Sequence, residues 1–165
     1  MPSISIIRRT VLAVIAAAAL SGCAGAPNAK PEACQPQPTL RTEPLEIVSE
    51  GRRARFSVEV ADDVHKREVG LMCRTSLAPD RGMLFDFKTP QEVAFWMHNT
   101  LIPLDMVFIG ADGRVFSVAS ARPLDDTPVP AGGPVRAVLE IPGGRARQLG
   151  ILPGDKVAHR IFQGE

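Results

Sequence analysis

The sequence predicts a mainly β (α+β) fold, a compact antiparallel β-barrel or sandwich with two short helices. Short stretches rich in β-branched and aromatic residues recur along residues 45–165, separated by Gly, Pro and Asp, which favour turns. The regular alternation of strands with longer helical segments, which a parallel sheet requires, is absent. About 120 residues suffice for one domain with a single core, but not for two domains.

The first predicted elements are a strand and a short helix. Apolar and polar residues alternate over residues 55–60, which is typical of a half-buried strand. Asp62 and Asp63 then provide a side-chain cap for a helix predicted over residues 64–72.

The remaining elements follow from turn signals and local composition. Asp112-Gly113 tolerates the positive φ of a tight hairpin, which would connect a strand over 104–109 to one that starts at Val115. Pro142 before the start and Gly150 past the end predict the second helix. Further strands are predicted over 82–87, 93–98, 135–141 and 156–162, and a loop over 122–134.

The N-terminus has the order of a secretory signal peptide. Arg8 and Arg9 precede an apolar run over residues 11–20, and small residues follow. The run is about ten residues long, roughly half of what a helix needs to cross a hydrocarbon core of ~30 Å. Leu20-Ser21-Gly22-Cys23 resembles the lipobox of bacterial lipoproteins, whose cysteine receives a diacylglycerol and becomes the mature N-terminus.

This resemblance implies export, removal of residues 1–22 and attachment to a membrane through acyl chains on Cys23, palmitate among them. Each buried methylene contributes ~0.8 kcal/mol, so several chains anchor a protein stably. Ala24, in place of an aspartate, resembles the signal for passage to the outer membrane, which favours that membrane over the inner one. The alternative is ordinary cleavage nearby, which would leave a soluble periplasmic protein.

The mature chain carries almost no net charge. Removal of residues 1–22 takes away two of the 19 basic and none of the 18 acidic side chains, which leaves a balance of −1. Such a domain lacks the basic footprint of a nucleic-acid-binding protein. Residues 23–44 are dense in proline and are predicted to form an extended tether ahead of the domain over 45–165.

Cys34 and Cys73 form an even pair in an oxidising compartment, which predicts a disulfide. The bond would close a loop of about 40 residues and would stabilise the fold by ~3–4 kcal/mol in the chain-entropy model. It would also fix the tether to the domain. The alternative is two free thiols, with Cys73 buried as a small apolar side chain.

The most unusual segment covers residues 95–105. On a strand, the period of two places Phe95 and Met97 on one face and Trp96 and His98 on the other. If the first pair fills the core, the second pair leads directly into a polar turn. An aromatic side chain beside convergent polar groups is typical of a pocket wall.

Four short motifs follow one another along the domain. They are Gly70-Leu71-Met72-x-Arg74, Gly82-Met83-Leu84-Phe85, Phe95-Trp96-Met97-x-Asn99-Thr100-x-Ile102-Pro103-Leu104-Asp105 and Gly154-Asp155. Together they resemble the family catalogued as domain of unknown function 192, over essentially all of residues 45–165. The resemblance implies a compact, mainly β domain, often secreted and often a lipoprotein, with no assigned activity. That family usually has Lys or Arg where this chain has His98.

These residues lead to one predicted site, a concave surface that binds a small polar ligand or the polypeptide of an envelope partner. The predicted lining residues are Trp96, His98, Asn99 and Asp105, joined by Arg74 and Glu140. Each also has a structural interpretation. Trp96 would pack in the core, Asn99 would bond the local backbone, Asp105 would pair with Arg74, and Glu140 would lie exposed on the polar face of its strand.

Two other functions remain open. A hydrolase would use His98 as a general base oriented by Asp105, although no nearby hydroxyl has an activating context. A copper protein would use the thioethers of Met72, Met83, Met97 and Met106, which lie among apolar residues where methionine is common core filler. The histidines lack the spacing of zinc ligands. The sequence therefore favours a binding module without a metal or cofactor.

Overall fold

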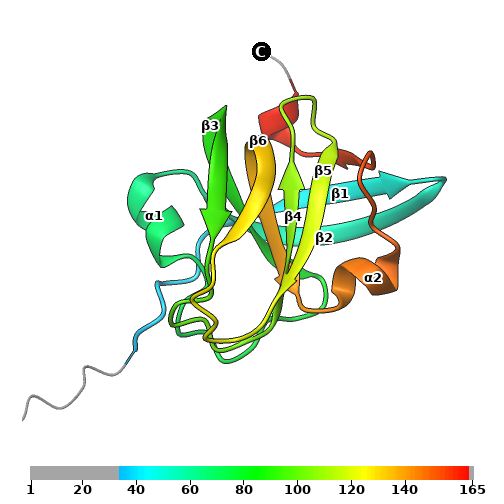
Figure 1. Ribbon diagram of the computed structural model, residues 1–165. Coiled ribbons are helices and arrows are strands. Elements are labelled where there is room, and N and C mark those ends of the chain that lie inside the picture. Colours follow the sequence, from blue (N-terminus) through cyan, green and yellow to red (C-terminus); the bar gives the residue numbers. More distant parts are fainter. Residues whose placement is uncertain (1–33, 164–165) are drawn as a thin grey trace, which may run out of the picture. The chain divides into compact units, whose positions relative to one another are not determined.

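The computed structural model describes residues 34–163, which form one curled sheet and two short α-helices (Figure 1). The elements are β1 (Thr42–Ser49), β2 (Arg52–Ala61), α1 (Val64–Val69), β3 (Arg81–Phe95), β4 (Leu104–Ile109), β5 (Val115–Ala121), β6 (Val129–Pro142), α2 (Arg145–Leu149), β7 (Lys156–Ala158) and the 3-10 helix η1 (Arg160–Phe162). The seven strands follow the order β5-β4-β6-β3-β2-β1-β7.

The mainly β class and the two short helices are confirmed, but the sheet is neither a closed barrel nor a sandwich. The edge strands β5 and β7 meet through one isolated bridge, between Arg114 and Lys156, which leaves the sheet a half-barrel. β2 and β3 pair in parallel, whereas the other neighbouring strands pair antiparallel. A parallel pair needs a crossover connection, and the segment that carries α1 provides it.

Two strands are longer than the sequence predicts. β3 continues across Thr89-Pro90 and joins the strands predicted separately over 82–87 and 93–98, because a register shift between Asp86 and Gln91 takes up the irregular residues as a bulge. β6 begins at Val129, so the second half of the predicted loop 122–134 is strand. Its prolines are tolerated because the ladder with β3 is shifted again nearby.

The local signals at the helix start and the hairpin are confirmed. The Asp63 carboxylate caps α1 by accepting a hydrogen bond from the backbone N–H of Lys66 at 2.8 Å. The turn before Gly113, whose φ is +70°, connects β4 to β5. The predicted last strand over 156–162 is shorter than expected, because the chain turns into η1 after His159.

Both faces of the central strands are buried. Successive residues of β4 enter different apolar clusters: Met106 and Phe108 pack in one cluster, while Val107 and Ile109 pack in the other. β3 and β6 alternate in the same way. A polar residue on either face of β4, in residues 82–86 of β3 or in residues 137–141 of β6 is therefore removed from bulk water.

The segment 34–41, here called the N-terminal strap, is attached to the domain at three points. Cys34 and Cys73 form the predicted disulfide, with Cα atoms 5.4 Å apart. The Gln37 amide donates to the Gly70 carbonyl at 2.7 Å, and the Leu40 N–H donates to a carboxylate oxygen of Glu59 at 2.6 Å.

β1 then starts at Thr42, so the end of the predicted tether belongs to the sheet. The predicted signal peptide and Cys23 lie outside the described residues. Within residues 34–163, no helix is both long and apolar enough to cross a bilayer.

Candidate functional site

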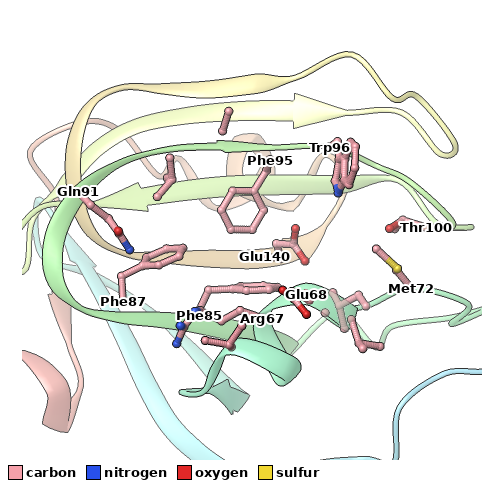
Figure 2. A pocket seen from close by; sticks show the side chains of 16 residues that line it. Arg67, Glu68, Met72, Phe85, Phe87, Gln91, Phe95, Trp96, Thr100 and Glu140 are labelled. Carbon is pink, nitrogen blue, oxygen red and sulfur yellow. The ribbon is translucent and has the colours of Figure 1, made fainter.

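A cleft of about 610 Å³ lies between α1 and β3, and we call it the α1–β3 cleft (Figure 2). Helix α1 contributes Val64, Arg67 and Glu68 to its lining. The opposite side is formed by aromatic residues of β3, and the loop after α1 adds residues 70–72. The cleft is therefore bounded by two segments that are adjacent in the sequence and by β6, which supplies Glu140.

Gly70 lets α1 end directly against the aromatic wall. Its φ is +50°, and its N–H donates to the Lys66 carbonyl at 2.9 Å, which closes the last turn. A Cβ atom at this position would lie only 3.1 Å from the Phe85 ring. Glycine therefore fixes how closely the end of the helix approaches the cleft wall.

The aromatic side chains of the cleft hold one another in place. Phe95 meets Phe85 edge to face with ring centroids 5.0 Å apart, and it meets Phe87 and Phe108 in the same way at 6.3 and 6.2 Å. Such pairs contribute roughly 0.5–1.5 kcal/mol each beyond area burial. The Arg67 guanidinium also covers the Phe87 ring, 5.5 Å from its centroid. The wall is preorganised rather than free to collapse.

Glu140 supplies the buried carboxyl group of the cleft. Its residue is only 4% exposed, and Figure 2 shows its carboxyl oxygens between Phe95 and Phe85. None of the side-chain hydrogen bonds or ion pairs within residues 34–163 involves this carboxyl group. Burial in these apolar surroundings raises its pKa to about 8, so the group is largely protonated at neutral pH.

The burial of Glu140 corrects the expectation of an exposed position. The reason is that α1 and the aromatic residues of β3 line the cleft on this side of β6, so Glu140 faces them rather than bulk water. Its neighbours Leu139 and Ile141 point into one core cluster. Glu140, whose cross-strand partners are Met83 and Met106, points to the other face and into the cleft.

Trp96 lies at the rim of the same cleft and is 56% exposed, so the core interpretation of this residue is wrong. The predicted division of faces is confirmed: Met97 is buried, whereas Trp96 and His98 share the exposed side, with ring centroids 5.5 Å apart. Phe95 packs against the core cluster. Trp96 thus gives the cleft an aromatic edge in contact with solvent.

The proposed pairing of His98 with Asp105 is not formed. His98 Nδ1 lies 3.1 Å from a carboxylate oxygen of Asp126, and both side chains are largely exposed. Asp105 is 1% exposed and accepts hydrogen bonds from the Ser120 hydroxyl at 2.6 Å and from the Ala146 N–H at 2.8 Å. Asp105 therefore connects β4 and β5 to the start of α2, which is a structural role.

Arg74 does not pair with Asp105 either. Its guanidinium makes two hydrogen bonds, of 2.6 and 2.8 Å, to the carboxylate of Glu59. Asn99 occupies a left-handed turn with a φ of +52°, and its carbonyl accepts from the Cys73 N–H at 2.8 Å. Both residues hold the loop beside the disulfide.

Of the six residues predicted for the site, Trp96 and Glu140 line the α1–β3 cleft, and the other four lie outside its lining. Sequence reasoning missed Arg67, Gln91 and the phenylalanines. Three of the four family motifs held a partial signal, because the lining includes Gly70-Leu71-Met72 of the first, Phe85 of the second, and Phe95, Trp96 and Thr100 of the third. The helix α1 itself carried no signal, because only the folded chain shows which of its sides faces β3.

Among residues 34–163, no group of three His, Cys, Asp or Glu side chains is arranged to hold a metal ion. Met83, Met97 and Met106 are fully buried in one core cluster, and Met72 lines the cleft. Three of the four methionines thus act as core residues.

Comparison with known proteins gives a family without an activity. The DUF192 family, described as Uncharacterized ACR, matches residues 46–159. A protein of unknown function from Novosphingobium aromaticivorans DSM 12444 has a similar solved structure, with 44% identity, a TM-score of 0.72, and coverage of 78% of this chain and 94% of that chain.

A second similar structure comes from Sinorhizobium meliloti 1021 and is named provisionally as a transcription regulator. It has 39% identity and a TM-score of 0.72, and the match covers 74% of this chain and 96% of that one. No curated protein matches. Because the family match spans well over half of the sequence and includes all seven strands at least in part, the chain belongs to the DUF192 family.

Proposed function

We propose that this protein is a ligand-binding module of the bacterial cell envelope, held at a membrane surface by acyl chains on Cys23, with the α1–β3 cleft as its ligand site. The carboxyl group of Glu140 carries the proposal, because it is buried in the cleft without a hydrogen-bond partner among the described residues. A buried polar group left unpaired costs roughly 1–3 kcal/mol. A ligand that bonds Glu140 would offset this cost, whereas the fold alone gains nothing from the carboxyl.

The size and lining of the cleft favour a small molecule. Its volume of about 610 Å³ falls within the ~300–1,000 Å³ of typical ligand pockets, which combine apolar walls with a few polar groups. Here the other polar groups of the lining are Thr100, Gln91 and the charged residues Arg67 and Glu68 on α1. A partner's polypeptide would need an interface of ~800 Å² per partner. We therefore favour a small amphipathic molecule.

The N-terminal strap limits the distance between the domain and Cys23, which supports the proposed anchoring. Cys34 is fixed to Cys73 by the disulfide, and it follows Cys23 by 11 positions. An extended chain spans at most ~3.3–3.6 Å per residue, so Cys34 would stay within roughly 40 Å of acyl chains on Cys23. The domain, and the cleft with it, would thus be kept close to the membrane surface.

The ligand site is tested by a thermal-shift screen of the domain against envelope metabolites and glycans. A ligand at a hundredfold excess over its dissociation constant should stabilise the protein by ~2.7 kcal/mol. For any hit, Trp96→Ala should weaken binding roughly tenfold, because the aromatic rim is lost. His98→Ala, which changes a neighbouring residue outside the lining, is the matched control. A hit weakened only by His98→Ala would place the site elsewhere.

The anchor is tested by replacing Cys23 with serine in the full-length protein expressed in a bacterium. We expect the wild type to sediment with membranes and the variant to be released or to keep its signal sequence, because serine has no thiol to acylate. Cys34→Ser is a control that leaves the lipid site intact. If the Cys23→Ser variant is processed and fractionates with membranes as the wild type does, the anchoring proposal is wrong.

A further inference from the structure

We infer that the ligand of the α1–β3 cleft is an uncharged, largely apolar molecule with a carbonyl or hydroxyl oxygen that accepts a hydrogen bond from the protonated carboxyl group of Glu140. This inference rests on the proposed function, because it specifies the chemistry of the ligand at the same site. Three features support it: the protonation state of the Glu140 carboxyl group, the charged side chains near that group, and the contacts that the aromatic rings of the cleft already make.

The surroundings of the Glu140 carboxyl group favour its neutral, protonated form. It is 4% exposed, and the strands on either side of β6 place Met83 and Met106 opposite it. An ionised carboxylate in such surroundings would need a cation and further hydrogen bonds to offset its desolvation. The described residues provide neither, since burial alone accounts for the raised pKa of Glu140. A neutral carboxylic acid both donates and accepts one hydrogen bond.

The charged groups near the cleft do not supply the missing cation. On α1, Arg67 donates to the Asp86 carbonyl at 3.0 Å and stacks on Phe87, and Glu68 has the same charge as an ionised Glu140 would have. On β6 itself, Arg136 is paired with the Asp86 carboxylate. The parts of β3 and β4 that face Glu140 present Met83, Phe85 and Met106. Arg67 is thus the one cation of the cleft lining, and it is bonded to the Asp86 carbonyl, stacked on Phe87 and followed in the lining by the acidic Glu68, so an anionic ligand would meet little net positive charge among these groups.

A cationic ligand fits less well than a neutral one. Ammonium recognition uses the open faces of several aromatic rings. In this cleft, Phe95 already meets Phe85 and Phe87 edge to face, and the Arg67 guanidinium occupies a face of Phe87. A second cation placed there would be repelled by Arg67. A neutral ring or short apolar chain can use the same walls without that penalty.

The single tryptophan provides the experiment. Because Trp96 is the only tryptophan of the chain and lies at the rim, its fluorescence reports directly on the cleft. We would titrate the full domain, residues 34–165, with three naphthalene probes that differ only in their polar group, namely a neutral amide, a primary ammonium and a carboxylate. Dissociation constants rather than intensities are compared at pH 6 and pH 9, because His98 lies beside the reporter ring.

We expect the amide to bind most tightly, and about tenfold more weakly at pH 9 than at pH 6. With a pKa of about 8, only roughly a tenth of Glu140 stays protonated at pH 9, and apparent affinity falls with the competent fraction. Glu140→Gln keeps a donor that does not titrate, so this variant should lose the pH dependence. Glu140→Leu should weaken the amide roughly tenfold at pH 6. Glu92→Gln, an exposed position on β3 outside the lining, should behave as the wild type.

The other possible results of the probe titrations would contradict either the proposed ligand chemistry or the proposed site. Tightest binding of the ammonium probe, with affinity that rises with pH, would show that Glu140 binds a cation, and it would overturn the inference but keep the cleft as the site. Tightest binding of the carboxylate, or an amide affinity independent of pH in the wild type, would also overturn the inference. If no probe changes Trp96 fluorescence or the melting temperature, the proposed ligand site itself fails.

Discussion

Replacing Glu140 by glutamine should remove a pH-dependent loss of stability that the wild-type domain shows between about pH 4.5 and pH 8. In the unfolded chain this carboxyl ionises around its ordinary pKa of 4.5, whereas burial raises the pKa to about 8 in the folded state. The folded state therefore binds this proton more tightly. Each pKa unit corresponds to about 1.36 kcal/mol, so the total effect is on the order of 5 kcal/mol.

The direction in which stability changes with pH follows from proton linkage. Stability from the bound proton is fully present below about pH 4.5, decreases as the unfolded chain ionises, and is lost once the pH has risen to about 8. Above that pH, both states are ionised and the contribution stays constant. Acidic groups whose pKa is lowered by partners, such as Asp86, have the opposite dependence, but they are common to the wild type and the variant.

The measurement is the free energy of unfolding in urea, determined from pH 4 to pH 9 for the wild type, Glu140→Gln and Glu140→Leu. The difference between wild type and Glu140→Gln isolates Glu140, because all other groups cancel. Glu92→Gln serves as the surface control and should run parallel to the wild type. Parallel curves for Glu140→Gln and the wild type would contradict a buried, neutral carboxyl.

The same series separates stability from binding. Glu140→Leu should be more stable than the wild type at pH 8, because an apolar side chain of similar size needs neither a proton nor a partner. It should also lose the ligand's hydrogen bond. A residue that destabilises the fold and strengthens binding is expected at a functional site, where stability and function compete. Replacing a residue with only a structural role would not raise stability while weakening ligand binding.

Features of the fold that depend on neighbouring residues could be predicted from the sequence. The Asp63 cap and the hairpin at Gly113 are local, and the folded chain keeps them. The alternation of β2 is kept as far as Val58, whereas Glu59 is buried although the pattern places it on the polar face. The sheet order, including the parallel pairing of β2 and β3, depends on contacts between distant segments. The two strands predicted over 82–87 and 93–98 form one strand, β3, for a related reason, because pairing with β6 tolerates a bulge at Thr89-Pro90.

In the candidate site, too, local features could be predicted from the sequence, whereas features that depend on distant segments could not. The sequence could place Trp96 on the side opposite Met97, because alternation is a local property, although β3 itself ends at Phe95. The burial of Glu140 could not be predicted, because it depends on α1 and the aromatic residues of β3, which line the cleft that Glu140 faces. His98 and Asp105 are close in sequence but separate in role, because Asp105 lies on β4 and is bonded to Ala146 at the start of α2. Sequence proximity was therefore a poor guide to the site.

Replacing Arg74 by methionine should destabilise the domain by about 3–5 kcal/mol, the usual cost of removing one partner from a buried ion pair. The side chains of Arg74 and Glu59 are only 14% and 7% exposed, and the two are joined by two hydrogen bonds. Without Arg74, the Glu59 carboxylate stays buried with the Leu40 N–H as its remaining partner.

We would measure urea unfolding of Arg74→Met, Glu59→Leu and the double variant. The double variant should lose less stability than the sum of the two single changes, because it alone leaves no buried charge behind. Arg53→Met is the matched control: it breaks the pair with Glu46, in which Arg53 is 61% exposed, and such surface pairs contribute ~0–1 kcal/mol. An Arg74→Met loss as small as that of Arg53→Met would contradict the prediction. Because Glu59 also holds the strap beside the Cys34–Cys73 disulfide, Arg74→Met should in addition speed hydrogen exchange at the Leu40 amide. Arg53→Met, on the far part of β2, should leave that amide unchanged.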